Sequence, residues 1–429
     1  MTKTIAGRPP RSSARRVTGR VAPPASKSHT IRALLIAAFA EGKSRLRSPL
    51  KSADTLSCRN AVQALGAEVT EDGENWIVDG FSGMPKACGG CIDVGNSGTT
   101  LFLSAALTAL SSKGFSFDGD SQLRRRSAAP LLDALRQMGA EAESSTEGCA
   151  PFTLRGPLTP GRVSVECPVS QYLSGLLLAA PLIRSPGETC IEVQGLNEAP
   201  YVGITLDWLD FQDIIYNREE WRLFRVPSGQ RYRHFDRLIP GDWSSATFFL
   251  AAAAVTGGSL VLDGLDIGDS QGDKAVLDML KTMGCRWDAL PGGVRIEGGQ
   301  LAGCELDLNA TPDALPAMAA AACFAEGETR LVNVPQARLK ETDRIAVISA
   351  ELGKLGADIT ELPDGLVIRG TPGSPLRGAL VDSHADHRVA MALAIAALGC
   401  VGSTSITGAD AVNITFPGFF DLLETVLEA

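Results

Sequence analysis

Cations stand at several points of this sequence in short motifs that could hold an anionic substrate. They are Lys27 and Arg32 in Ser26-Lys-Ser-His-Thr-Ile-Arg32, Arg126 at the end of three consecutive arginines, Lys340 and Arg344 in Lys340-Glu-Thr-Asp-Arg344, and Arg388. The net charge of the chain is −9, so only such local groups could attract an anion. Arginine suits this role because its guanidinium group binds a carboxylate or phosphate with two parallel hydrogen bonds. A single arginine of this kind is more often solvated, but together they predict a substrate with more than one anionic group.

Carboxylates occur in or near the same motifs and could carry out proton transfer. Asp313 and Glu341 are the candidates, because a carboxylate among cations stays ionised and can accept a proton from a nearby hydroxyl group. Lys27 could deliver a proton. His387 lies between Asp386 and Arg388 and is predicted either to contact a phosphate group or to act as a structural helix cap. The predicted catalytic residues are Lys27, Asp313, Glu341 and His387.

These motifs lie at the beginning of helix-like segments that repeat along the chain. Alanine-rich apolar stretches begin near Ser28, Ser97, Ser170, Ser244, Pro312 and Asp386. In phase with them, an apolar residue, a glycine and a small residue close another helix-like segment at Gly66, Gly139, Gly284 and Gly356. The interval is about 72 residues or twice that, which indicates six copies of one supersecondary unit. The third copy lacks the glycine.

Each repeat alternates short β-branched strands with two helical segments, which is an α/β pattern. The first helix is apolar on nearly all sides, so it is predicted to be buried with sheets outside it. If these helices are parallel, their N-termini emerge on one face, where unpaired N–H groups and helix dipoles favour anions. The Ser, Thr and Asp residues at these starts could be simple N-caps. The cations beside them favour a binding face.

The length predicts two domains, because 429 residues exceed what a single hydrophobic core usually holds. Six repeats then divide into three and three. Pro and Gly before two of the repeat starts place hinges near 20–25 and 238–242. Domain I is predicted to contain 1–23 and 240–429, with 1–16 as a disordered tail, and domain II to contain 24–239. Hinged domains with anion-attracting faces suggest closure around a ligand.

Composition excludes several classes of protein. The negative net charge argues against a nucleic-acid-binding surface, and no apolar run reaches 18 residues, so no membrane span is expected. Ten irregularly spaced cysteines are typical of the reduced thiols of a cytoplasmic protein. The pair Cys88-Gly-Gly-Cys91 has no second pair at zinc spacing, so no metal site is predicted. We expect a cytoplasmic monomer.

Nine motifs, in order from about residue 17 to the C-terminus, resemble those of the enolpyruvyl transferases, and most closely those of the 5-enolpyruvylshikimate-3-phosphate (EPSP) synthases. They are Pro-Ala-Ser-Lys-Ser with Arg32 (24–32), Gly-Asn-Ser-Gly-Thr (95–99), Leu-Arg-Arg-Arg (123–126), Ser-Gln-Tyr (170–172), Pro-Gly-Asp-Trp-Ser-Ser-Ala (240–246), Pro-Asp (312–313), Leu-Lys-Glu-Thr-Asp-Arg (339–344), Asp-His-Arg-Val-Ala-Met (386–391) and Thr-Phe-Pro (415–417). The resemblance implies a two-domain inverted α/β barrel, built from six βαβαββ-type units with three in each domain.

The resemblance also implies a reaction and its residues. Phosphoenolpyruvate would lie in the interdomain cleft, bound by Lys27, Gly98, Arg126, Gln171, Lys340, Arg344 and Arg388. Further substrate contacts are implied at Ser28, Arg32, Asn96, Thr99, Ser170, Tyr201, Asp313 and Gln336. An acceptor hydroxyl would attack C2 of phosphoenolpyruvate while C3 is protonated, and phosphate would leave the tetrahedral intermediate, with Asp313 and Glu341 as the acid/base carboxylates. No metal or cofactor is implied. The alternative of another class is a non-catalytic, anion-binding regulator.

Several acceptor-binding positions depart from the shikimate enzymes. Val169 stands in place of a serine, Glu198 replaces the serine before a Pro-Tyr pair, Phe102 replaces an arginine, and Gln336 replaces an asparagine. A carboxylate within about 5 Å of a phosphate is repulsive by roughly 1 kcal/mol or more unless a cation lies between them. We therefore predict an acceptor other than shikimate 3-phosphate, and favour the 3′-hydroxyl of UMP, which related enzymes of nikkomycin and polyoxin biosynthesis use. Shikimate 3-phosphate is the alternative.

Overall fold

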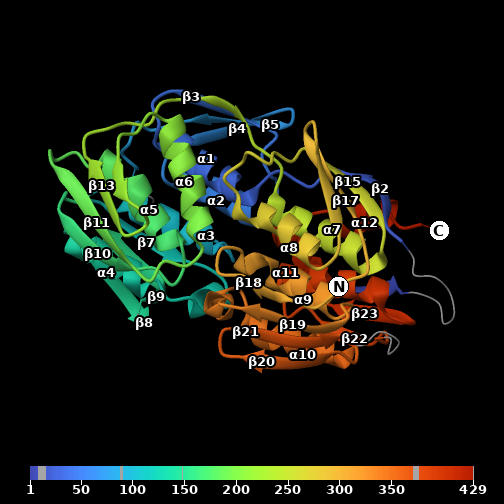
Figure 1. Ribbon diagram of the computed structural model, residues 1–429. Coiled ribbons are helices and arrows are strands. Elements are labelled where there is room, and N and C mark those ends of the chain that lie inside the picture. Colours follow the sequence, from blue (N-terminus) through green and yellow to red (C-terminus); the bar gives the residue numbers. More distant parts are fainter. Residues whose placement is uncertain (8–15, 87–89, 147, 371–375, 429) are drawn as a thin grey trace. The chain divides into compact units, whose positions relative to one another are not determined.

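A computed structural model describes residues 1–7, 16–86, 90–146, 148–370 and 376–428 (Figure 1). The chain divides into two compact units: unit 1 is Met1–Pro24 with Pro240–Ala429, and unit 2 is Ala25–Ile239. Each unit is described below by itself. Cys88, and with it the Cys88-Gly-Gly-Cys91 pair, lies outside the described residues.

Unit 2 contains three repeats, each with an inner helix, an outer helix and a four-stranded sheet. The inner helices are α1 (Lys27–Phe39), α3 (Gly98–Thr108) and α5 (Gln171–Ala179), and the outer helices are α2 (Ala53–Ala64), α4 (Ala129–Gln137) and α6 (Ala199–Phe211). The sheets are β14-β3-β5-β4 (Asp236–Leu238, Lys43–Arg47, Asn75–Asp79, Glu68–Asp72), β6-β7-β9-β8 (Cys91–Asp93, Gly114–Asp118, Cys149–Arg155, Glu141–Thr146) and β10-β11-β13-β12 (Arg162–Glu166, Glu188–Gln194, Leu223–Pro227, Asn217–Glu219). In each sheet the first two strands are parallel and the other pairs antiparallel.

Unit 1 repeats this plan. Its inner helices are α7 (Trp243–Thr256), α9 (Leu315–Ala322) and α11 (His387–Gly399), and its outer helices are α8 (Val276–Thr282), α10 (Arg344–Lys354) and α12 (Phe419–Thr425). The sheets are β2-β15-β17-β16 (Thr18–Val21, Ser259–Asp263, Gly293–Glu297, Arg286–Leu290), β18-β19-β21-β20 (Glu305–Asp307, Gly327–Val332, Gly365–Gly370, Asp358–Leu362) and the three-stranded β22-β23-β1 (Leu380–Asp382, Ser403–Thr407, Thr2–Ala6). The predicted α/β class with six repeated units is confirmed.

Two strands each pair with a sheet of one unit, although the repeat that follows them in the sequence belongs to the other unit. Strand β2 comes just before α1, yet it pairs in parallel with β15 of unit 1. Strand β14 comes just before α7, yet it pairs in parallel with β3 of unit 2. Each unit therefore takes the first strand of one of its sheets from a distant part of the sequence.

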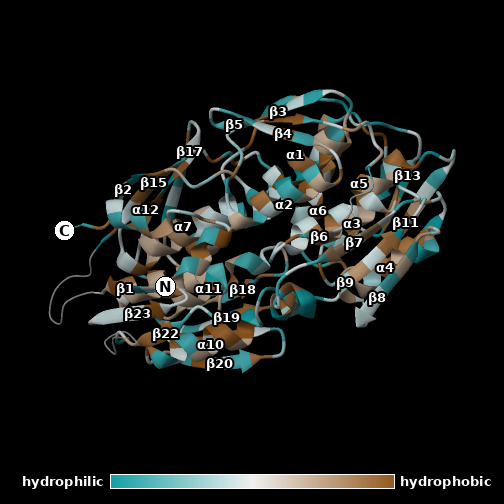
Figure 2. Ribbon diagram, turned by 180° about the vertical axis from the view of Figure 1, so that it is seen from behind, coloured by the Kyte–Doolittle hydropathy of each residue, from teal (hydrophilic) through white to brown (hydrophobic). Residues whose placement is uncertain are grey.

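The inner helices form the core of each unit. They are buried along almost their whole length, as in α11, where every residue from His387 to Gly399 is buried. In unit 1 the three inner helices contact one another, and in unit 2 α3 contacts both α1 and α5. Contacts with the sheets of their own repeats are made by α1, α3, α7, α9 and α11. The strands alternate between buried and more exposed residues, as in β9 and β5, and their colours in Figure 2 accordingly change between brown and teal. Alanine allows such close helix packing because its side chain is small.

Five of the six described outer helices end in one way, and this explains the glycine repeat. Gly66, Gly139, Gly284 and Gly356 lie two residues beyond α2, α4, α8 and α10, with φ between 94° and 114°. This left-handed conformation favours glycine. In the third repeat Asp213 takes the same place after α6, with φ 54°. The third copy is therefore intact in structure, and an aspartate replaces the glycine.

The prediction of a disordered tail over 1–16 is wrong for Thr2–Ala6. These residues form β1, which pairs antiparallel with β23 from Thr2–Thr407 to Ala6–Ser403 and buries Ile5. The sequence suggested disorder because arginines there stand among Pro, Ser and Gly with no apolar region after them, but the edge of a distant strand supplies pairing partners for Thr2–Ala6. Residues 8–15 lie outside the described residues. Among the described helices, none is long and apolar enough to cross a membrane.

Candidate active site

Arg344 is the centre of a buried ion-pair cluster in unit 1. It is the first residue of α10, and its side chain is 1% exposed. Its Nε atom lies 2.8 Å from Asp386 Oδ2, Nη1 2.7 Å from Asp313 Oδ1, and Nη2 2.5 Å from Glu341 Oε2. Burial alone would lower the pKa of Arg344, but the three carboxylates raise it above its usual range. Arg344 is therefore held as a cation that binds three anions.

Asp313 joins a second arginine to this cluster. Arg388, which is 4% exposed, donates from Nη2 to Asp313 Oδ2 at 2.8 Å. Asp313 lies in a short 3-10 helix (Pro312–Ala314) directly before α9, and its side chain is 15% exposed. Its two carboxylate oxygens thus each accept from a different arginine, an arrangement that favours the ionised form.

Asp386 is the structural member of the cluster. It is the N-cap of α11 and accepts hydrogen bonds from the backbone N–H groups of Arg388 and Val389, besides those from Arg344 and Thr342. Through Arg344, the starts of α9, α10 and α11 are therefore linked. The sequence had indicated the cations and carboxylates of these motifs. It had not indicated that one arginine binds three of the carboxylates.

The other predicted residues of unit 1 are placed around these helix starts. His387 is fully buried, with Nδ1 4.0 Å from Asp386 Oδ1, while Lys340 and Glu341 are each 9% exposed. Gln336 is buried in a 3-10 helix (Pro335–Leu339) and donates to the carbonyl oxygen of Asn309 at 2.9 Å. The helix cap in this region is Asp386 rather than His387.

In the described part of unit 2, Arg32 is buried without a carboxylate partner. Its guanidinium group donates to the Thr205 hydroxyl at 2.8 Å, to the Ser28 and Tyr201 carbonyl oxygens at 3.0 and 2.9 Å, and to the Ser174 hydroxyl at 3.4 Å. Burial lowers the pKa of Arg32 to about 10, which still leaves it charged near neutral pH. These bonds link the first turns of α1 and α6 with α5. Thr205 and Ser174 could not be singled out from the sequence, because hydroxyl groups on apolar helices are common.

Lys27 is the first residue of α1, and its partner is a carboxylate. Its Nζ atom lies 3.1 Å from Asp54 Oδ2, and the two side chains are 15% and 5% exposed. Asp54 lies in the first turn of α2. The N-cap of α1 is Ser26, whose hydroxyl accepts from the backbone N–H of His29. Ser28 is therefore not the cap.

Gly98 and Arg126 come together at the start of α3. A Cβ atom added to Gly98 would lie 2.3 Å from Nη1 of Arg126, so the absence of a side chain lets the guanidinium group rest on this helix end. The same group lies 5.8 Å from the centre of the Phe102 ring, a distance typical of a cation–π contact. Ser97 caps α3 by accepting from the N–H of Thr100. The Phe102 ring therefore helps to hold the Arg126 guanidinium group at this helix end.

Ser170 and Glu198 come together at the start of α5. The Glu198 carboxylate accepts from the Ser170 hydroxyl at 2.8 Å and from the Ser170 backbone N–H at 3.3 Å. Glu198 is 1% exposed and has a φ of 58° at the N-terminal end of α6. A negative charge is favourable at a helix N-terminus. A carboxylate of the protein thus occupies an anion position at this helix end.

The remaining predicted residues of unit 2 lie near these helix starts. Gln171 is the first residue of α5, and its Oε1 atom is buried without a hydrogen-bond donor among the residues that the structure describes. Val169 is 4% exposed. Asn96 donates to Asp120 and Gln122, each at 2.7 Å, and Thr99 is partly buried in the first turn of α3. No group of three or more His, Cys, Asp or Glu side chains that could hold a metal is found among the residues the structure describes.

Comparison with known proteins identifies relatives of this chain. The model of the family described as EPSP synthase (3-phosphoshikimate 1-carboxyvinyltransferase) matches residues 12–423. A protein named 3-phosphoshikimate 1-carboxyvinyltransferase from Acetivibrio thermocellus is 50% identical over 409 residues, which are 95% of this chain and 96% of that protein. One of the same name from Halobacterium salinarum is 40% identical, covering 98% of this chain and 97% of that protein. The solved structure of EPSP synthase from Acinetobacter baumannii has a TM-score of 0.82 and 26% identity, and covers 99% of this chain and 98% of that chain.

Proposed function

The chain belongs to the EPSP synthase family and is a carboxyvinyl transferase, and on this premise we propose that it transfers the enolpyruvyl group of phosphoenolpyruvate to a hydroxyl group of shikimate 3-phosphate, with release of phosphate. The acceptor follows from the name that relatives up to 50% identical carry. The observation that supports the chemistry is the Arg344 cluster, in which Asp313 and Glu341 are kept next to buried cations.

The proposed reaction has an addition step and an elimination step. In the addition, the acceptor hydroxyl loses its proton to Asp313 or Glu341, its oxygen bonds to C2 of phosphoenolpyruvate, and C3 gains a proton. In the elimination, C3 loses a proton while the bond between C2 and the phosphate oxygen breaks, which restores the C2–C3 double bond. Lys27 is the proposed donor of the proton to C3. Cations that face the departing phosphate stabilise its charge, and this electrostatic effect is expected to be the largest.

The proposal assigns different roles to the two sets of residues. Arg126, supported by Gly98 and Phe102, and Lys27 are proposed to bind phosphoenolpyruvate from unit 2, because their charged groups lie at helix N-termini. Arg388 and Lys340 are proposed to do so from unit 1. Arg344 has three carboxylate partners of its own, so we propose that it mainly positions Asp313 and Glu341. His387 is proposed to be structural, since it is fully buried.

UMP, the acceptor that the sequence suggested, receives no support from the relatives described above, and neither does a role in antibiotic biosynthesis. The specific observation that still favours a changed acceptor is Glu198. Its carboxylate already binds the hydroxyl and N–H groups of Ser170, so a phosphate of the acceptor would have to displace it or bind elsewhere. An acceptor without a phosphate at this position is therefore the second candidate. The cytoplasmic location and the monomeric state stay predictions.

The two candidates differ in a direct assay. The protein is incubated with phosphoenolpyruvate and either shikimate 3-phosphate, shikimate or UMP, and phosphate release is followed. We expect turnover with shikimate 3-phosphate at rates usual for enzymes, about 1–1000 per second. Glu198→Ser is expected to lower the KM for shikimate 3-phosphate, and Glu198→Gln is the matched control that keeps the side-chain size. Turnover with shikimate or UMP, and none with shikimate 3-phosphate, would exclude the first candidate.

A further inference from the structure

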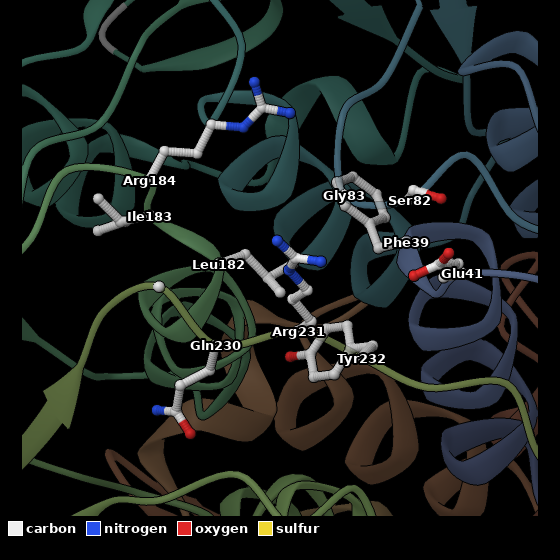
Figure 3. Close-up of a pocket in the computed structure, with 11 residues that line it drawn as sticks. Phe39, Glu41, Ser82, Gly83, Leu182, Ile183, Arg184, Gln230, Arg231 and Tyr232 are labelled. Atoms are coloured by element: carbon white, nitrogen blue, oxygen red, sulfur yellow. The ribbon is translucent and has the colours of Figure 1, made fainter.

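A cavity of about 400 Å³ opens in unit 2 at the end of α1 that is opposite to Lys27. It is lined by Phe39, the last residue of α1, by a loop after the 3-10 helix Ala180–Leu182, and by the segment 229–232 that leads to β14 (Figure 3). Helix α1 has 13 residues, so the cavity lies about 18 Å along this helix from Lys27. It is therefore separate from the helix-start residues discussed above.

The floor of the cavity is apolar and well packed. Phe39 and Tyr232 are each 1% exposed, and Leu182 is 8% exposed. The Tyr232 hydroxyl donates to the carbonyl oxygen of Leu178 at 2.8 Å, so the polar end of this side chain is already satisfied. Because these side chains are almost fully buried, only a small apolar group could pack on them.

The two segments that carry the charged residues of the cavity are held together by backbone hydrogen bonds. Gly229 N–H donates to the Ile183 carbonyl and Gln230 N–H to the Pro181 carbonyl, each at 2.8 Å. The Gln230 side chain bonds to both backbone groups of Ile215 and, in Figure 3, turns in the opposite direction from Arg231. The cavity is thus formed before any ligand binds, as is usual for small-molecule sites.

The charges at the cavity are unpaired. Arg184 and Arg231 are exposed, and their side chains make no hydrogen bond, ion pair or ring contact within the described residues. Among the described arginines of unit 2, only Arg125 shares this property. The Glu41 carboxylate lines the same cavity and forms no ion pair with either arginine in the described structure. Figure 3 shows the Arg231 guanidinium group reaching between Leu182 and Glu41.

Two simpler explanations for these unpaired arginines account for fewer of the observations. Cations near a helix C-terminus often donate to its last carbonyl oxygens, but neither Arg184 nor Arg231 does so among the described contacts. Exposed arginines are also often solvated, yet two of the three unpaired ones in the described part of unit 2 line the same cavity. Two positive charges against one negative charge, over an apolar floor, favour a ligand that is an anion at one end and apolar at the other.

We propose that this cavity binds a small organic anion, in which a carboxylate or phosphate group is joined to an apolar ring or chain. The anionic group contacts Arg184 and Arg231, whose guanidinium groups suit either oxyanion. The apolar part packs on Phe39, Leu182 and Tyr232. Glu41 lowers the affinity for a purely anionic ligand and so selects against small inorganic anions.

Calorimetric titration with benzoate, phenyl phosphate and uncharged phenol tests the proposal. Either anion is expected to bind saturably and phenol is not, and the tighter anion identifies the preferred group. Arg184→Gln and Arg231→Gln are each expected to weaken binding roughly tenfold, as the loss of one charge-assisted hydrogen bond would. Glu41→Gln is expected to strengthen it. Arg222→Gln is the matched control, because Arg222 is an exposed arginine of unit 2 that does not line the cavity.

Phenyl phosphate could also bind at the helix starts, so the same titration is done with Arg388→Gln. This variant keeps the cavity and should retain the binding that the cavity variants lose. Thermal melting shows that each variant is folded. The proposal is overturned if neither anion binds saturably, if Arg231→Gln binds as tightly as the unmodified protein, or if Arg222→Gln weakens binding equally.

Discussion

The helix starts of the two units are built on the same repeat but hold their arginines differently. In unit 1, Arg344 is buried against three carboxylates, one of which also binds Arg388. In unit 2, Arg32 is buried against hydroxyl and carbonyl oxygens only, and Arg126 rests on the N-terminus of α3. Unit 1 therefore compensates Arg344 and Arg388 with carboxylates, whereas in unit 2 Arg32 is held by neutral oxygens and Lys27 by the carboxylate of Asp54.

The difference shows that repeats with the same backbone arrangement can carry different charges at their helix starts. Each repeat supplies a helix N-terminus, which attracts anions by itself. At the starts of α11 and α5, the carboxylates of Asp386 and Glu198 already occupy the anion position. At Gly98 the group that rests on the helix end is instead a cation, Arg126.

Arg344→Met should be the most damaging substitution. It leaves Asp313, Glu341 and Asp386 without their shared cation in a buried place, which is expected to lower the free energy of unfolding by about 3–5 kcal/mol. Urea denaturation measures this. Arg330→Met, which removes a half-exposed arginine that pairs with Glu305 and Glu328, should cost no more than about 1 kcal/mol. Equal losses in both variants would show that the buried cluster stabilises the fold no more than an exposed ion pair does.

Asp313→Asn should abolish most of the activity while the fold persists. The amide keeps the shape of the side chain but cannot accept a proton, so kcat is expected to fall roughly 100-fold or more. Phosphate release from phosphoenolpyruvate with shikimate 3-phosphate measures it, and circular dichroism confirms that the fold is kept. Asp307→Asn serves as the control, because Asp307 is an exposed residue of β18 in the same unit. Activity within twofold of the unmodified enzyme would remove Asp313 from the proposed mechanism.

Arg32→Met should cost less stability than Arg344→Met, although both arginines are buried. Its partners are neutral, and the Thr205 hydroxyl already donates to the Ser174 hydroxyl at 2.9 Å, so no buried anion is left behind. The expected loss in the free energy of unfolding is about 1–3 kcal/mol. Measuring both variants under the same conditions sharpens the contrast between the units, and a larger loss for Arg32→Met would reverse it.

Gly98→Ala should weaken phosphoenolpyruvate binding with little change in stability. The added methyl group would meet the guanidinium group of Arg126, which must then move away from the start of α3. We expect the KM for phosphoenolpyruvate to rise about tenfold with a smaller change in kcat, as when ground-state and transition-state binding are lost alike. Gly203→Ala is the matched control, since nothing lies within 4 Å of a Cβ atom there. An unchanged KM would exclude Arg126 as a phosphoenolpyruvate ligand.

The smallest effect concerns acid sensitivity on α10, the helix that Arg344 begins. Burial alone would raise the pKa of Glu351, but Lys354, His384 and the N–H of Asp382 hold it below its usual range. A lowered carboxyl pKa stabilises the fold above the unfolded pKa, near 4.3, and this stability is lost as pH falls through the folded value. The stability difference between the unmodified protein and Glu351→Gln should therefore shrink below about pH 4. A difference independent of pH would contradict the ion pairing.

Much of the fold was predictable because its signals are local. The starts of α1, α3, α5, α7 and α11 lie within two residues of the predicted ones, since short polar N-caps followed by apolar residues determine where a helix begins. The third repeat was not recognised in full, because Asp213 adopts a backbone conformation that usually needs glycine. Strand β1 was missed because its pairing partner, β23, is about 400 residues away in the sequence.

The repeat, the helix starts and the types of charged residue at these starts follow from the sequence alone, because helical periodicity and capping depend on neighbouring residues. The pairing of the charges, in contrast, follows from the packing of the folded chain. Arg344 and Asp386 are 42 residues apart, and Ser170 and Glu198 are 28 apart, so their contacts depend on how separate helices pack in each unit. Coulomb energy depends on distance in space and on burial. For this reason Glu198 could be recognised in the sequence as a misplaced charge, but only the structure revealed it as a partner of Ser170.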